Sequence, residues 1–125
     1  MARSVLDSSA VLAFINGEPG AEIVAPLIAD SLISAVNVAE VITKLVHRSG
    51  SLEPAQQALA ILDLNVVDFD RNLAENAGGL AAKVKGLSLG DRSCLSLALR
   101  EGVPAVTGDR AWKDIDLGIE VHLFR

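Results

Sequence analysis

The chain has 125 residues, enough for one domain over 1–125. Half of the residues are hydrophobic and few are aromatic, so we expect an aliphatic core that is stable without disulfides or a structural metal. The single cysteine excludes an internal disulfide and a cysteine-based zinc site, and the net charge of −5 argues against nucleic-acid binding through a basic surface. No run approaches the ~20 apolar residues of a membrane span. Asp7 also interrupts the N-terminus too early for a secretory signal, so we expect a cytoplasmic protein without a membrane partner.

The hydrophobic period changes repeatedly along the chain, between the two-residue period of strands and the 3.6-residue period of helices. In chain order this pattern predicts a strand over 3–7, a helix over 8–15, a helical run from Ala21 that Pro26 interrupts, a strand over 31–36, helices over 37–50 and 53–64, a strand over 65–70, helices over 71–86 and from 88, a strand over 104–109, a short turn around Trp112 and a strand over 120–124. Because helical segments separate the strands, we expect parallel pairing and a three-layer α/β/α sandwich.

The predicted topology places four carboxylates at one edge of the sheet. Functional sites in open parallel sheets form outside the carboxyl ends of the strands. The four are Asp7 at the end of the first strand, Glu40 in the first turn of the helix after the second strand, Asp91 at the start of the helix before the fourth strand, and Asp109 at the end of that strand. We therefore expect them to converge.

Each acid taken alone has an ordinary structural explanation. These explanations are Asp7 as an N-cap, Asn37 with Glu40 and Ser88 with Asp91 as capping boxes, and Asp109 in a Thr-Gly-Asp turn. Asp91 is the exception, because at 100° per residue it falls on the apolar face of its helix with Cys94 and Leu95. The other face carries Ser93 and Ser96. On this pattern Cys94 belongs to the core, and Asp91 points inward.

Convergence of four acids requires a ligand. Two unit charges ~4 Å apart repel by ~4 kcal/mol at an effective dielectric of 20, so four carboxylates cannot stay ionised together without a cation or protons. Carboxylate oxygens without histidine or cysteine select Mg²⁺, or Mn²⁺ as its substitute, over Zn²⁺. A metal held by carboxylates with open coordination positions activates water and stabilises charge in phosphodiester hydrolysis.

The motifs around the acids resemble those of PIN-domain ribonucleases, and more narrowly the VapC toxins of bacterial toxin–antitoxin pairs. The segments that carry the resemblance are "VLDSSA" at 5–10, "EPGAE" at 18–22, "NVAEV" at 37–41, "LSLGDRSCLSLAL" at 87–99, "AVTGDRAW" at 105–112 and the ending "DLGIEVHLFR". They cover essentially the whole chain. Their order is specific, although each motif alone is weak.

The resemblance implies a five-stranded parallel sheet in the order 3-2-1-4-5, a Mg²⁺-dependent endoribonuclease, a homodimer and inhibition by a cognate VapB-type antitoxin. By motif match, it makes Asp7, Glu40, Asp91 and Asp109 the catalytic and metal-binding acids, with Asp7 and Asp91 the surest ligands. Ser9 and Thr107 match small polar positions that support the acids. The basic residues that follow the site closely enough to contact RNA are Lys44, Arg48, Arg92, Arg110 and Lys113. Trp112 is expected as a core anchor, with stacking on a base as the alternative.

Two other function classes fit part of the pattern. A receiver-like phospho-acceptor domain has similar length and architecture, with Asp68 or Asp70 as acceptor. It requires a lysine at the end of the fifth strand, which "EVHLFR" lacks, and it leaves Glu40 and Asp91 unexplained. The second alternative is a non-catalytic module that only binds RNA or a partner protein; binding of a divalent metal distinguishes it from the nuclease.

Overall fold

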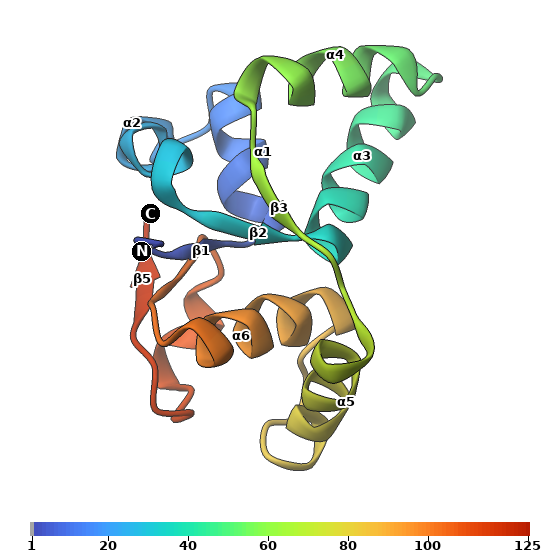
Figure 1. Cartoon of the computed structure of the whole chain (residues 1–125). Helices are drawn as coiled ribbons and strands as arrows, with labels where there is room; N and C mark the ends of the chain where they lie inside the picture. The colour runs from blue at the N-terminus through green and yellow to red at the C-terminus, as the bar shows by residue number, and fades with distance from the viewer. Residues whose placement is uncertain (1) are drawn as a thin grey trace.

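A computed structural model describes residues 2–125 (Figure 1). Its elements in chain order are β1 (Val5–Leu6), α1 (Ser8–Asn16), α2 (Ala21–Val24), the 3₁₀ helix η1 (Ala25–Asp30), β2 (Leu32–Ser34), α3 (Ala35–Ser49), α4 (Glu53–Leu62), β3 (Asn65–Val67), α5 (Arg71–Gly79), η2 (Leu80–Ala82), α6 (Leu89–Glu101), β4 (Ala105–Thr107), η3 (Arg110–Asp114) and β5 (Val121–Leu123). The predicted elements are therefore present in the predicted order, with shorter strands.

The five strands form one parallel sheet in the order β3-β2-β1-β4-β5, which confirms the fold class and the strand order that the resemblance implies. The central strand β1 pairs with β2 through Val5 opposite Leu32, and with β4 through Val5 opposite Ala105. Backbone pairing extends past β1, because the amide of Asp7 donates to the carbonyl of Val106 at 3.1 Å. Asp7 is therefore held at the carboxyl edge of the sheet.

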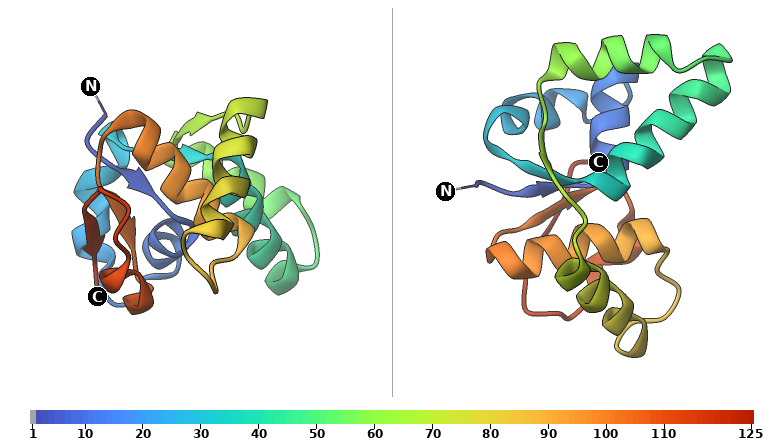
Figure 2. Two further views of the ribbon diagram at one scale, coloured as in Figure 1. Left: turned by 90° about the horizontal axis from the view of Figure 1, so that it is seen from below. Right: turned by 45° about the vertical axis from the view of Figure 1, so that its right-hand side comes forward.

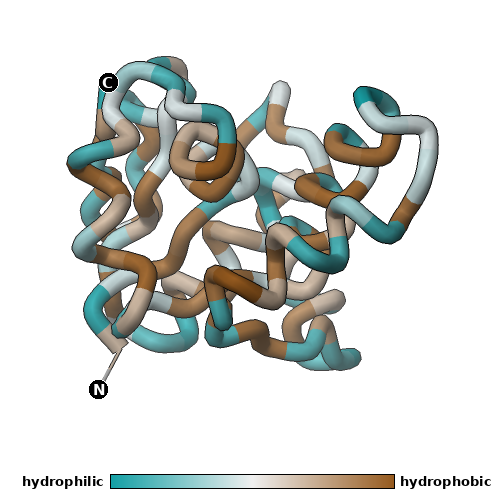
Figure 3. The backbone as a smooth tube through the Cα atoms, turned by 90° about the horizontal axis from the view of Figure 1, so that it is seen from above, coloured by the Kyte–Doolittle hydropathy of each residue, from teal (hydrophilic) through white to brown (hydrophobic). Residues whose placement is uncertain are grey.

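Helices cover both faces of the sheet (Figures 1 and 2). α1, α3 and α4 lie on one side of the strands, and α5 and α6 lie on the other. In Figure 3, hydrophobic and hydrophilic residues alternate along the helical turns, as expected of helices that bury one side. This is the three-layer sandwich that alternating strands and helices predict.

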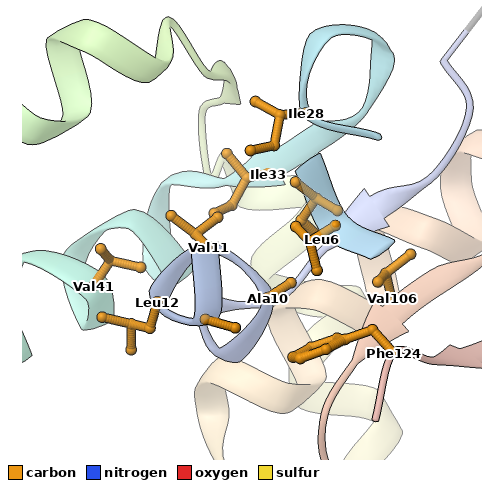
Figure 4. Packing of buried hydrophobic residues seen from close by; sticks show 11 residues of the cluster. Leu6, Ala10, Val11, Leu12, Ile28, Ile33, Val41, Val106 and Phe124 are labelled. Atoms are coloured by element: carbon orange, nitrogen blue, oxygen red, sulfur yellow. The ribbon is translucent and has the colours of Figure 1, made fainter. Parts of the chain in front are cut away.

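The core consists of two apolar clusters, one on each face of the sheet. Neighbouring residues of β1 point to opposite faces, so that Leu6 packs with Val11 and Ile33 beneath α1 (Figure 4), whereas Val5 packs on the other side with Leu95. All five of these residues are at most 1% exposed. The ends of β1, α1 and α6 are thus fixed by packing, and this fixes the side chains at the sheet's carboxyl edge.

Two helix boundaries differ from the sequence prediction for identifiable reasons. α3 begins at Ala35 rather than at residue 37, because Ser34 is the N-cap and its hydroxyl accepts from the amide of Val36 at 3.2 Å. The prediction of Asn37 as the cap is wrong. At Pro26 the helical run changes type: α2 ends at Val24 and the 3₁₀ helix η1 follows, since proline lacks the N–H that would continue α-helical bonding.

The predicted polar face of α6 is also wrong, because α5 packs against it. Ser93 and Ser96 are 1% and 2% exposed, and Leu97 is fully buried. Each serine hydroxyl makes a hydrogen bond to a backbone carbonyl of the same helix: Ser93 donates to Leu89 at 2.7 Å, and Ser96 donates to Ser93 at 3.1 Å. The prediction that Cys94 lies in the core is confirmed.

Within residues 2–125, no single helix is long and apolar enough to span a membrane; the pair Ser8–Asn16 and Ala21–Asp30, bent by 114°, passes only by combined length and composition.

Candidate functional site

Asp7 is the most buried acid of the chain's described part, and both of its oxygens are held. It follows β1 and caps α1: Oδ1 accepts from the amide of Ala10 at 3.0 Å and from the hydroxyl of Ser9 at 2.6 Å. Oδ2 accepts from the hydroxyl of Thr107 at 2.5 Å. Asp7 is only 6% exposed, so burial raises the pKa of its carboxyl group above the ordinary value despite these hydrogen bonds.

Ser9 and Thr107 connect Asp7 to the end of β4. The Ser9 hydroxyl accepts from the amide of Gly108 at 2.9 Å, and the Thr107 hydroxyl accepts from the amide of Asp109 at 3.0 Å. Each hydroxyl therefore donates to Asp7 and accepts from the backbone after β4. Asp109 itself is exposed, and its carboxylate caps η3 by accepting from the amide of Ala111 at 3.0 Å.

Asp91 lies in the first turn of α6, where it forms the capping box that the spacing predicts. Its Oδ2 accepts from the amide of Ser88 at 3.0 Å, and its own amide donates to the Ser88 hydroxyl at 3.1 Å. The side chain is half-buried. Its charge faces Asp7 closely enough to help raise the pKa of that carboxyl. Asp91 therefore caps α6 and also lies close to the buried carboxyl of Asp7.

Glu40 reaches across from α3 to the first turn of α6. The buried side-chain amide of Asn37 donates to Oε1 of Glu40 at 2.9 Å and to the carbonyl of Gly90 at 3.0 Å. A Cβ at Gly90 would overlap the carboxyl group of Glu40, so the two residues are in direct contact. Asn37 Oδ1 is buried without a hydrogen-bond partner in the described chain. The side chain of Asn37 in α3 and the backbone of Gly90 in α6 thus set the position of Glu40.

Asp7, Glu40 and Asp91 lie around the buried thiol of Cys94, and of the other two acids only Asp91 acts on the pKa of Asp7. Burial raises the pKa of the Cys94 thiol, and the negative charges of Asp7, Asp91 and Glu40 raise it further. Asp109 contributes to neither shift and is linked to Asp7 only through Thr107. Among residues 2–125, no group of three or more acids, histidines or cysteines is arranged so that it could hold a metal ion.

The donor chemistry fits a hard divalent cation. The converging groups are carboxylate oxygens, and no histidine takes part in the contacts described above. Asp7 is buried against a second negative charge, a combination that a bound cation would relieve. The residues that could hold such an ion are Asp7, Asp91 and Glu40, with Asp109 at the outer rim.

The predicted basic residues occupy three different places. Arg110 and Lys113 are exposed on η3, directly after Asp109, and Lys44 and Arg48 are exposed on α3. Arg92 is half-buried and donates to the carbonyl of Ala77 on α5 at 3.1 Å. Its guanidinium therefore contacts the α5 layer, and its role as an RNA contact stays a prediction.

Trp112 is fully buried in the cluster beneath α6, so it is the predicted core anchor and offers no ring to a base. Sequence reasoning missed two other residues. Gly90 carries no chemistry of its own, so only its contact with Glu40 reveals its role. Arg125 lies beside the site through its ion pair with Glu18 at 2.9 Å, and no sequence signal marked it as a binding residue.

Comparison with known proteins agrees with this architecture. A family model described as PIN domain matches residues 4–117. No curated protein sequence matches the chain. Among solved structures, VapBC2 from Rickettsia felis bound to a promoter DNA fragment has a TM-score of 0.75 at 21% identity, covering 96% of this chain and 97% of that one.

Two further structures have similar coverage. A toxin–antitoxin complex from Klebsiella pneumoniae has a TM-score of 0.73 at 18% identity, over 93% of this chain and 94% of that one. The VapC20 structure from Mycobacterium tuberculosis, described as a sarcin-ricin loop cleaving toxin, has a TM-score of 0.69 at 20% identity, over 90% and 95%. At these identities the likeness concerns the fold.

Proposed function

The chain belongs to the PIN domain family, and from this premise we propose that it is a divalent-metal-dependent endoribonuclease acting as the toxin of a type II toxin–antitoxin pair. The observation that carries the proposal is the buried carboxyl of Asp7, held on both oxygens and facing Asp91. An acid whose pKa is raised by burial next to a like charge is typical of a functional site rather than of a solvated cap.

The chain's own residues have separable tasks in this proposal. Ser9 and Thr107 hold Asp7, the capping box holds Asp91, and Asn37 holds Glu40. Each of these acids would bind Mg²⁺ or Mn²⁺. The chemistry that such a cation supplies when bound is activation of water for attack on phosphorus and neutralisation of the charge that develops there.

The partners are proposed on the same basis. RNA is the substrate, with Lys44, Arg48, Arg110 and Lys113 available for its phosphates. A VapB-type antitoxin is the inhibitor, supported by structural neighbours described as toxin–antitoxin complexes. A cavity of 380 Å³, lined by the half-exposed Ile23 with Leu27 and Leu123 among others, offers that partner an apolar surface. A homodimer remains a proposal from the resemblance alone.

The receiver-like alternative finds no support in the structure. Asp70 caps α5 by accepting from the amide of Leu73 at 2.9 Å, and it pairs with Arg100 at 3.5 Å. Asp68 follows β3, the edge strand, on the far side of β2 from the converging acids. Neither carboxylate has the environment of a phospho-acceptor.

The experiment that tests the function is incubation of purified chain with total bacterial RNA, with Mg²⁺ or with a chelator, followed by sequencing of the RNA ends. We expect discrete internal cleavage sites with the metal and none with the chelator. Cleavage that is indifferent to the chelator, or intact RNA in both samples, would contradict the proposal. The second result would favour the non-catalytic binding module.

Gly90→Ala tests the contact that places Glu40. The new Cβ displaces the carboxyl group, which is the mobile end of a side chain, so we expect the free energy of unfolding to change by less than about 1 kcal/mol. RNA cleavage should fall by about ten- to a hundredfold, the usual effect of disturbing residues around a metal site. Gly78→Ala on α5 is the matched control, since a Cβ there meets open space. Unchanged cleavage by Gly90→Ala would show that this contact does not set the position of Glu40 for cleavage.

A further inference from the structure

A small basic cavity adjoins the acidic site. Its volume is about 170 Å³, and three of its lining residues are cations: Lys44 and Arg48 from α3, and Arg125 after β5. Ser8 and Ser9, the first two residues of α1, line it as well. At ~30 Å³ per water, this volume has room for a tetrahedral oxyanion with accompanying water. In a chain with a net charge of −5, three converging cations call for an explanation.

A hydrogen-bond network fixes the two guanidinium groups around this cavity. Arg125 donates to Oε1 of Glu18 at 2.9 Å, and Asn16 donates to Oε2 of the same carboxylate at 3.1 Å. Arg48 donates to Oδ1 of Asn16 at 2.5 Å. Each arginine uses one N–H of its five in this network, so most of each fork stays available to a ligand. The arginines are therefore already positioned before any ligand arrives.

The charges of the cavity favour an anion. The hydrogen bond from Arg125 holds the pKa of Glu18 below its ordinary value, so this carboxylate is ionised and offsets one of the three cations. Two positive charges remain. Lys44 makes no hydrogen bond or ion pair with any residue in 2–125, so its charge is not offset.

Ser9 joins the cavity to the acids. Its hydroxyl donates to Asp7 at 2.6 Å and accepts from Gly108 at 2.9 Å, while the same residue lines the basic cavity. An anion in the cavity is therefore next to the carboxylates and is chemically distinct from a cation bound by them. A polyanion crossing this edge of the sheet would meet both.

We propose that this cavity, built by Lys44, Arg48 and Arg125, is a subsite for a backbone phosphate of the RNA that neighbours the phosphodiester at Asp7. The inference rests on the proposed function, because it takes RNA as the substrate. It adds a defined place for a second phosphate, and it assigns Arg125 a role in binding. A planar guanidinium group can donate hydrogen bonds to two oxygens of one phosphate at the same time. The ammonium group of Lys44 adds a positive charge.

The test measures RNA binding apart from cleavage. The full-length chain carrying Asp7→Asn, in buffer without divalent ions, is titrated into a fluorescein-labelled 12-nucleotide single-stranded RNA between 50 and 200 mM salt. We expect Lys44→Gln and Arg48→Gln, each added to that chain, to weaken binding about tenfold or more. Each should also reduce the slope of log affinity against log salt by about 0.7.

Controls separate a phosphate subsite from the alternatives. Arg71→Gln and Lys83→Gln remove exposed cations on and after α5, in the opposite helix layer, and should leave binding unchanged. Lys44→Gln should also leave the unfolding temperature unchanged, which separates lost binding from lost folding. Equal weakening by the controls, or no weakening by Lys44→Gln and Arg48→Gln, overturns the subsite even if the wild type cleaves RNA. A wild type that neither binds nor cleaves RNA overturns the proposed function together with the subsite.

Discussion

Asp7→Asn and Asp91→Asn are each expected to lower RNA cleavage by more than about a hundredfold while the chain stays folded. Loss of residues that merely surround a metal costs ten- to a hundredfold, and these two are proposed to bind it directly. The measurement is the initial rate of cleavage of one labelled RNA at saturating Mg²⁺. Asp116→Asn is the matched control, because it makes the same chemical change at an exposed loop position before β5. Cleavage within tenfold of the wild type would exclude the altered acid as a ligand.

The same Asp7 variant should melt no lower than the wild type in metal-free buffer at neutral pH. Burial raises the pKa of Asp7, so the native state keeps its proton to a higher pH than the unfolded chain does. The stabilisation from this carboxyl is therefore complete below the unfolded pKa and is lost as the pH rises through the folded pKa. Wherever the buried carboxyl is ionised it carries a desolvation cost, and asparagine removes that cost. A much lower melting temperature would mean that the helix cap outweighs this cost.

Divalent metal should stabilise the wild type strongly. A ligand that binds only the native state contributes RT ln(1 + [L]/Kd), about 2.7 kcal/mol at a hundredfold excess over Kd. For a domain of this size that corresponds to a rise of roughly 10 °C in melting temperature. The measurement is thermal unfolding with and without Mn²⁺ at constant ionic strength.

The effect should disappear in Asp91→Asn and persist in Asp116→Asn. A melting temperature that Mn²⁺ leaves unmoved in the wild type would count against the metal site. An equal rise in all three proteins would indicate weak binding to the acidic surface in general.

Much of the fold could be predicted because local signals and topology agree. Alternating strands and helices require parallel pairing, and the carboxyl edge follows from where each strand ends. The strand order came from the family resemblance. The predicted polar face of α6 is wrong because periodicity treats a helix as having one buried side. In the structure α5 covers the other side, and Ser93 and Ser96 are buried with their hydroxyls bonded inside the helix.

The acids of the site could be predicted from the sequence, but the contacts that arrange them could not. Asp7 and Asp91 follow from strand ends and helix caps. The role of Asn37 could not be predicted, because its amide bonds to Gly90, 53 positions away, while Ser34 takes over the cap. Arg125 likewise reaches the site through residues that are distant in the sequence, by a hydrogen bond to Glu18, 107 positions away, and by packing against Gly108. Contacts at such separations leave no trace in local spacing.

The central claim is that Asp7, Glu40 and Asp91 form one divalent-metal site, and calorimetric titration of Mn²⁺ into the metal-free chain tests it most directly. The account predicts saturable binding by the wild type and by Asp116→Asn, and loss of that binding in Asp7→Asn and in Asp91→Asn. Absence of saturable binding in the wild type, or equal affinity in all four proteins, would contradict it.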